Sequence, residues 1–450
     1  MWQKRAFKIL LFLGGASLLL VLSLVYNYVH EKNQIEQTAL AQVKQGTVYQ
    51  INTKLQQQSA IELRHQQIGI VLCLIVFLVF FSALFFRADK GDSYRLWMVV
   101  CSASVLLLIG LGFVLSFAQQ TLFEDKGTII ADKASLHQFL SANSKQSLSP
   151  KALPNAVPTG IFIESITFSN DNYVNLTGHI WQKYHDDTHK GIARGFIFPQ
   201  SSMKIVEAYR HKENKTEVIG WFFEGSVPQQ FDYSKYPLDK REISLLIHHK
   251  DIDKNIHLVP DLAAYTRLKP SALPGIKHDM IVSGWHTKSS FFHYQTHLSE
   301  TSKKHFFTLH FTVLLQRDLL NPFLFNVLPL IMVVCMLFVI QLFIGRMGAF
   351  ANIVAPLAAL FFGVILAHLE LRREVLTPNI VSFEYYYLMM YIDILSVAAG
   401  YFLFYTNKFL FIQTNKLLFL QYRDGLVTKL LFLPLILGNI LWLTIWMFYI

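Results

Sequence analysis

The sequence is short of charged residues. Asp, Glu, Lys and Arg make up 16% of its 450 residues, whereas soluble globular proteins average about 25%. Hydrophobic residues make up 53%, and 38 of them are phenylalanine. One soluble core does not accommodate this excess, so we expect much of it to lie in lipid. The scarcity of charge therefore excludes an ordinary soluble protein.

Cysteine and enzyme motifs are also scarce. The three cysteines, Cys73, Cys101 and Cys335, all fall in long apolar runs, so no disulfide or cysteine metal site is expected outside the membrane. There is no glycine-rich phosphate loop, no Gly-x-Ser-x-Gly and no His-Glu-x-x-His. We therefore expect no enzyme, no cofactor and no metal.

Long apolar runs are abundant. A helix needs about 20 apolar residues to cross the hydrocarbon core of a bilayer. Seven runs meet this length, at about 8–28, 68–86, 96–118, 323–344, 349–369, 385–406 and 430–449. The first run also has features of a secretory signal, since Lys4, Arg5 and Lys8 precede it and Ala39-Leu40-Ala41 resembles a cleavage site. Its length favours a membrane span.

Basic residues near the ends of the runs predict the orientation, because Lys and Arg at span ends stay in the cytoplasm. Counting spans from a cytoplasmic N-terminus places every basic cluster on the cytoplasmic side: Lys4, Arg5, Lys8, Arg87, Lys90, Arg95, Arg346, Lys408, Lys416, Arg423 and Lys429. Residues 119–321 and the C-terminus then lie on the periplasmic or extracellular side of a cell inner (plasma) membrane. The net charge of +10 reflects this topology and does not indicate nucleic acid.

The segment between the third and fourth spans has strand character. Short runs rich in Ile, Val, Phe, Tyr and Thr alternate with polar residues and end at Asn, Asp, Gly and Pro clusters, which is typical of an antiparallel sandwich. We expect an N-terminal membrane region at 1–118, a linker at 119–159, a β domain at 160–321 and a four-helix membrane domain at 322–450. The Gln-rich segment 31–66 predicts an amphipathic helical hairpin or coil outside the membrane.

One loop of the predicted β domain is distinctive. Residues 231–241 read Phe-Asp-Tyr-Ser-Lys-Tyr-Pro-Leu-Asp-Lys-Arg and precede a strand. The pattern resembles the signature loop of pentameric ligand-gated ion channels of the prokaryotic type, which lack the flanking cysteines. Its matching residues are Phe231, Asp232, Tyr236, Pro237, Leu238 and Asp239. Other pieces follow in the family's order, including Ile180 to Tyr184, Val259 to Asp261, Phe291 to Tyr294, Arg317 and four spans.

The resemblance covers about residues 160–450 and implies an immunoglobulin-like antiparallel β-sandwich followed by a four-helix transmembrane bundle. It also implies a homopentamer gated by a small-molecule ligand or by protons. The span 349–369 would line the pore, through Arg346, Ala351, Ala355, Ala358, Phe362 and either Ile365 or Leu366. This face has no acidic ring and no Ser or Thr ring. The alternatives are a pore gated by dewetting at Phe362 and a close-packed span that carries no current.

Charges near the outer end of that span have two interpretations. Arg372 and Arg373 are expected to pair with Asp239 or Asp232 of the signature loop and transmit motion, or else to solvate a helix end. Asp393 lies inside the next span, where a charge is expensive. It either has a function or hydrogen-bonds a neighbouring helix.

Aromatic residues supply the ligand-binding candidates. In the family the site lies between subunits, and by position it would take Trp181, Tyr184, Trp221 or Phe222, and Tyr294. The alternative is that these rings fill the core. The 17 histidines are a possible metal or proton sensor, but none has a spacing that distinguishes it from a surface histidine.

Two functions remain open on the sequence alone. The first is a pentameric ligand- or proton-gated ion channel in membrane lipid. The second is a non-conducting sensor or assembly scaffold of the same fold, which docks a partner membrane protein through residues 1–118.

Overall fold

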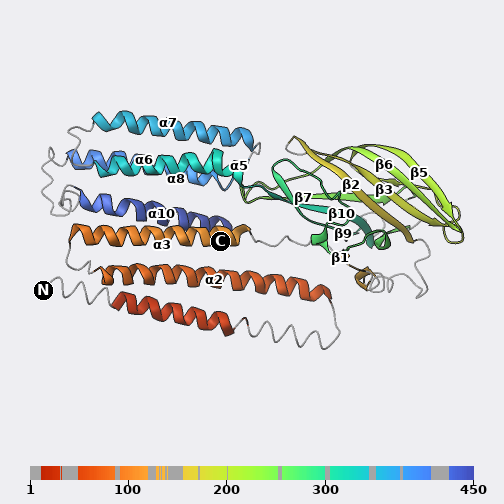
Figure 1. Ribbon diagram of the computed structural model, residues 1–450, viewed down its shortest axis with the longest axis horizontal. Helices are drawn as coiled ribbons and strands as arrows, with labels where there is room; N and C mark the ends of the chain where they lie inside the picture. The colour runs from red at the N-terminus through yellow and green to blue at the C-terminus, as the bar shows by residue number, and fades with distance from the viewer. Residues whose placement is uncertain are drawn as a thin grey trace. The chain divides into compact units, whose positions relative to one another are not determined.

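The computed structural model describes residues 12–30, 32, 49–86, 92–119, 128–130, 132, 134–136, 139, 156–170, 173–199, 201–251, 256–298, 305–343, 351–375, 379–406 and 425–449. The chain divides into two compact units (Figure 1). One combines Met1–Leu122 with Phe323–Ile450, and the other is Phe123–Pro322. We call them the membrane unit and the β unit.

The β unit contains two five-stranded sheets. The first has the order β1-β9-β10-β7-β4 and the second the order β5-β6-β3-β2-β8. The strands are β1 (Thr128–Ile130), β2 (Ala156–Asn170), β3 (Tyr173–His185), β4 (Phe196–Ile197), β5 (Ser202–Glu213), β6 (Thr216–Pro228), β7 (Lys240–His249), β8 (His257–Pro260), β9 (Trp285–Leu298) and β10 (His305–Arg317). All pairs are antiparallel except β2 with β8.

Alternating side chains build one core between the sheets. Along β3 every second residue from Val174 to Tyr184 is buried, as expected for a strand with one face in a core. β7 alternates in the same way, and side chains from both sheets join one hydrophobic cluster. Strand β5 differs, because nearly all of its residues are exposed.

The β unit begins earlier than the sequence predicts. Strand β2 starts at Ala156, and β1 lies within the predicted linker 119–159. Val157 is fully buried, and Ala156 to Thr159 pair with β8 in parallel. Pro158 lies within this strand, and a proline is tolerated where the strand does not need an N–H donor.

Among the residues that the structure describes, seven helices are long and apolar enough to cross a membrane, so the chain is a multi-pass membrane protein. These helical stretches are Phe12–His30, His65–Phe85, Ser93–Ala118, Leu320–Leu342, Asn352–Glu374, Glu384–Phe404 and Leu426–Phe448. They agree with the seven runs in the sequence. The last four belong to α5 (Leu320–Pro322) with a π-helical turn (Phe323–Val327) and α6 (Leu328–Leu342), then α7 (Ala351–Glu374), α8 (Glu384–Thr406) and α10 (Leu426–Tyr449).

Contacts between neighbouring helices define the packing of the membrane unit. The helix at Phe12–His30 lies beside α2 (Tyr49–Phe85), where Gln67 donates a hydrogen bond to the Tyr28 hydroxyl at 2.7 Å. α3 (Ser93–Gln119) joins α2 to α10 through a small core of Ile68, Val114, Leu441 and Ile445. α7 packs against α6 and α8 at the other side of the unit (Figure 1).

Two helices bear on details of the prediction. Residues 49–66 form the first part of the continuous helix α2, whereas residues 31 and 33–48 of the predicted hairpin or coil lie outside the described residues. Glycine and proline are missing from Tyr49 to Gln67, so nothing breaks the helix before the membrane span begins. Pro329 lies inside the helical span Leu320–Leu342, just after the π-helical turn, and a π adjustment of this kind lets a membrane helix tolerate a proline.

The β core gives a first test of the fold. Ile180 in β3 is fully buried, whereas Ile281 is 90% exposed. Removing a buried aliphatic side chain leaves a cavity, so Ile180→Ala should lower the free energy of unfolding by about 2–5 kcal/mol. Ile281→Ala, the matched control, should change it by less than about 0.5 kcal/mol. Thermal melting of the full chain in detergent measures both, and equal shifts would contradict this core.

Candidate functional site

The predicted signature loop is tied to the last strand of the β unit by an ion pair. Arg317, at the end of β10, donates through Nε and Nη2 to the two carboxylate oxygens of Asp239 at 2.6 and 2.8 Å. The Asp239 side chain is 2% exposed and that of Arg317 13%. A two-point contact between planar groups fixes distance and orientation together. The loop and strand β10, which leads to the fourth span, are therefore held as one piece.

Aromatic rings enclose a second arginine beside this pair. The guanidinium carbon of Arg241 lies 4.2 to 5.4 Å from four ring centroids, those of Phe168, Phe231, Tyr233 and Trp285. Arg317 stacks on Tyr236 at 4.9 Å and on Trp285 at 4.4 Å. Trp285 thus contacts both cations. Ring faces carry negative potential, so they stabilise guanidinium groups that have left water.

Hydrogen bonds within the loop give it a defined shape. Asp232 Oδ1 accepts the Ser234 N–H at 2.8 Å. The backbone N–H of Tyr236 donates to the Tyr233 carbonyl, and the backbone N–H of Leu238 donates to the Lys235 carbonyl. The Tyr236–Pro237 peptide bond is cis. Tyr236 is almost fully buried. Tyr233, Tyr236 and Asp239 of this loop are therefore packed into the β unit, whereas Asp232, Ser234 and Lys235 are exposed.

The arginines predicted to meet this loop have partners inside the membrane unit. Arg372 Nη2 lies 2.7 Å from Glu384 Oε2, and Arg373 lies 3.6 Å from Glu370. His368 contacts the same Glu384 oxygen at 3.5 Å. The two contacts of Glu384 join α7 to the start of α8, whereas the Arg373–Glu370 pair lies within α7. Pairing of Arg372 or Arg373 with Asp239 or Asp232 stays a prediction.

The predicted pore face of α7 is largely exposed among the residues that the structure describes. Ala355, Ala358 and Phe362 are exposed, Ile365 is half-buried and Leu366 is exposed. The opposite face is buried and is formed by Ile353, Leu357, Val364 and Leu371. The structure describes the backbone but not the side chain of Ala351, and Arg346 lies outside the described residues. The α7 stripe, defined as Ala355, Ala358, Phe362 and Leu366, follows one side of the helix.

The aromatic ligand candidates divide between two faces of the sheets. Tyr184, Trp221 and Tyr294 are buried in the β core, and the Tyr294 hydroxyl donates to the Leu258 carbonyl at 2.8 Å. Trp181 and Phe222 lie on the other face of their sheet, where Trp181 Nε1 donates to Asp261 at 2.9 Å. One chain therefore does not bring the five rings together.

A buried polar network surrounds Tyr184. Its hydroxyl donates to Gln182 Oε1 at 2.6 Å and accepts the Gly195 N–H at 3.0 Å. His249 Nδ1 accepts the Asp251 N–H, so Nε2 carries the proton and donates to the Tyr184 oxygen at 3.2 Å. Burial raises the pKa of Tyr184 to about 12 and lowers the pKa of His249 to about 4. Both groups are thus neutral at pH 7.

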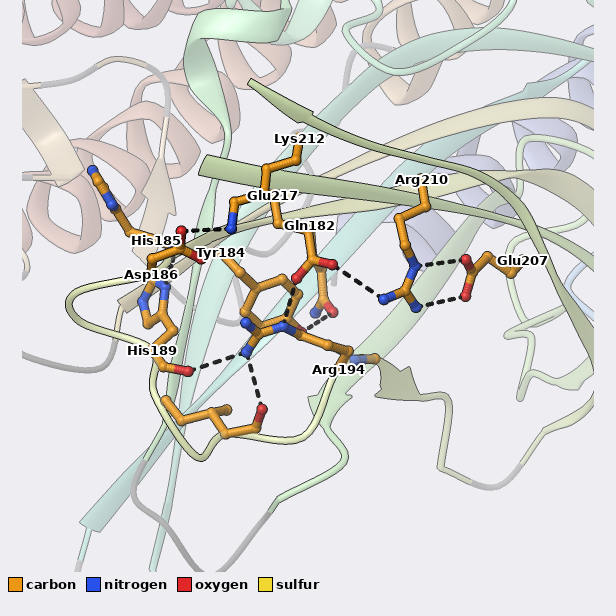
Figure 2. Close-up of polar contacts among 12 residues, drawn as sticks. Gln182, Tyr184, His185, Asp186, His189, Arg194, Glu207, Arg210, Lys212 and Glu217 are labelled. Carbon is orange, nitrogen blue, oxygen red and sulfur yellow. Dashed lines mark hydrogen bonds and ion pairs between the residues drawn. The ribbon is translucent and has the colours of Figure 1, made fainter. Parts of the chain in front are cut away.

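Charged residues cover this network on its solvent side. Figure 2 shows Arg194 in front of the Tyr184 ring, with its guanidinium carbon 4.3 Å from the ring centroid. Arg194 Nε donates to Glu217 at 2.9 Å, and Nη1 donates to the His189 and Ile192 carbonyls. Arg210 in turn bridges Glu207 and Glu217.

The loop between β3 and β4 forms one wall of a cavity beside these residues. His189 Nδ1 accepts the His185 N–H at 2.7 Å, and Nε2 donates to the Ala156 carbonyl. Burial lowers the pKa of His189. Lys212 lies 2.7 Å from Asp186 and Lys215 lies 2.9 Å from Asp187. The hydrogen bond from Lys212 lowers the pKa of the Asp186 carboxyl.

Only a weak signal in the sequence marks this cavity. His185-Asp186-Asp187 and His189 are residue types that bind metals, but the described residues contain no group of three or more potential ligands close enough to hold a metal. Arg194 and Glu217 lie in separate segments that neither motif nor spacing connects. The chain matches no protein-family model, and it matches no curated protein sequence.

Buried histidines predict that acid weakens the β unit. Burial lowers the pKa of both His249 and His293 to about 4, whereas a histidine in the unfolded chain titrates near 6.5. Between these values the unfolded state binds more protons, so stability rises with pH. This contribution is complete above about pH 6.5 and is lost as the pH falls to about 4.

Melting temperatures at neutral pH and near pH 4.5 test this dependence. We expect the acid-induced drop to shrink in the double variant His249→Gln, His293→Gln. His278→Gln is the control, because the His278 side chain is fully exposed. A drop that is the same in the double variant and in the wild type would show that other groups carry the effect.

The Asp239–Arg317 pair makes a separate prediction. Asp239→Asn keeps the shape of the side chain but leaves a largely buried guanidinium group without its carboxylate. Loss of one member of a buried ion pair costs about 3–5 kcal/mol, so the melting temperature should fall clearly. Asp279→Asn is the control, since the Asp279 side chain is 92% exposed. A D239N protein as stable as the control would argue against this role for the pair.

Proposed function

We propose that the protein is a pentameric ligand- or proton-gated ion channel. Its β unit would sense the signal, and α7 would line the pore. The observation that carries the proposal is the two-point Asp239–Arg317 contact. It joins the loop that resembles the family's signature loop to the strand that leads directly into the last four membrane helices.

The arrangement of strands supports the same proposal. Two sheets share one core, which fits an immunoglobulin-like sandwich of the kind the resemblance implies. The signature-like loop connects β6 to β7, so it passes from one sheet to the other. A loop that links both sheets is well placed to respond when one sheet moves against the other.

The exposed stripe on α7 supports a pore. Phe362 is 64% exposed and Leu366 68%, although the opposite face of the helix is packed. In a ring of subunits this stripe would face the axis. Rings of large apolar side chains close a pore by excluding water, so Phe362 would be the gate. Small Ala355 and Ala358 would leave the pore wider on the Arg346 side.

The basic residues at the span ends support the orientation. The N-terminus and the Arg346 link would be cytoplasmic, and the β unit and the C-terminus would lie on the periplasmic or extracellular side of a plasma membrane. This orientation exposes the β unit to external ligands and protons.

The alternative is a non-conducting sensor or scaffold of the same fold. It is favoured by the α7 stripe, which has no charged or hydroxyl side chain, and by the three N-terminal helices. The helix at Phe12–His30 presents Phe12, Leu19 and Tyr26 at 70% exposure or more. In this alternative that helix would dock a partner membrane protein.

Phe362 allows the two functions to be separated. We expect particle images of the purified protein to show five subunits, and proteoliposomes to pass ions on addition of ligand or acid. Phe362→Ala should raise the resting ion flux by roughly tenfold, because it removes the apolar constriction. Phe402→Ala, which removes a ring 52% exposed on α8, should leave the flux unchanged.

The outcome that contradicts the channel is also defined. If neither the wild type nor F362A passes ions at any pH tested, and the particles are not pentamers, the channel proposal fails. A stoichiometric partner that remains bound through residues 1–118 would then support the scaffold.

A further inference from the structure

One cavity in the β unit lies beside the loop between β3 and β4. Its volume is about 610 Å³, within the range of small-molecule sites. The loop supplies most of the lining, and the turn between β5 and β6 supplies the rest. The lining residues are Asp186, Asp187, His189, Lys190, Gly191, Ile192, Arg194 and Lys215.

Hydrogen bonds within the β unit hold the loop in this shape. Two of its carbonyls, at His189 and Ile192, accept hydrogen bonds from Arg194 Nη1 at 3.1 and 3.0 Å. The His189 ring holds the His185 N–H and the Ala156 carbonyl. Gly191 has φ of +73°, a conformation that glycine adopts without strain. A site formed in advance binds without the cost of ordering the loop.

The acidic and basic groups of the lining differ in how much hydrogen-bonding capacity their present partners leave unused. Asp186 and Asp187 already accept from Lys212 and Lys215, so they offer little to a cation. On the basic side, the hydrogen bonds of Arg194 involve Nε and Nη1. Its Nη2 group, and the ammonium group of Lys190, have no acceptor among the residues that the structure describes. The hydrogen-bond donors that remain unused in the cavity therefore favour an anionic ligand.

We propose that this cavity binds a small, polar organic anion that carries a carboxylate. Arg194 Nη2 and Lys190 would donate to the carboxylate, and charge-assisted hydrogen bonds of this kind are among the stronger ones. Ile192 is the single aliphatic residue of the lining, so the cavity favours a polar ligand over an apolar one. The binding of this anion does not depend on the proposed function. The further step, that this anion is the signal that gates the channel, rests on the proposed sensing function.

Lys190 makes the direct test possible, because its replacement breaks no contact within the described residues. The assay is thermal melting of the full chain in detergent with succinate, against sodium chloride at equal ionic strength. Succinamide is the neutral probe of the same shape. We expect succinate but not succinamide to raise the melting temperature, and Lys190→Glu to weaken the apparent affinity for succinate by about tenfold or more.

Lys288→Glu is the matched control, since Lys288 is exposed on β9 and does not line the cavity. It should bind succinate as the wild type does. The inference is overturned if succinate gives no protection, if succinamide protects equally, or if K190E and K288E behave alike. Ion flux reports separately on the channel. Succinate binding without ion flux would support this site but not the channel. Ion flux without succinate binding would support the channel and contradict this site.

Discussion

The structure around the signature-like loop depends on three charged side chains that lie close together and largely buried, those of Asp239, Arg241 and Arg317. Asp239 is 3% exposed and Arg241 9%, and Arg317 lies against both Asp239 and the Trp285 ring. Charges removed from water need partners of matching geometry. One carboxylate serves Arg317, and four aromatic rings enclose Arg241. The path of residues 231–241 follows from these contacts.

The membrane helices were predictable because lipid imposes a simple requirement. Every backbone polar group must be satisfied within the helix, and the side chains must be apolar over about 20 residues. All seven runs in the sequence meet this requirement, and each is helical over the part that the structure describes. The alternating strands β3 and β7 were equally readable. Strand β5 was not, because its polar, exposed residues have no alternation, and its pairing with β6 is a backbone property.

The candidate site was predictable only in part. A local motif marked residues 231–239, and Arg317 was expected from its position before a span. The contact between them joins residues 78 positions apart, and no local pattern reveals it. Tyr184 and Trp221 were read as ligand cage candidates, yet their strand positions place them in the core. The cavity at Arg194 depends on side chains from two distant segments, so composition and spacing did not reveal it.

Strand β7 joins the two polar regions of the β unit. Arg241, near its start, belongs to the aromatic enclosure, and His249, at its end, belongs to the network beneath Arg194. The two residues are about eight steps apart along the extended chain, a length of about 26 Å. The ladder with β10 runs almost unbroken along this length. Such a strand neither stretches nor shortens, so a ligand at one end would influence the other only by tilting the sheet as a lever.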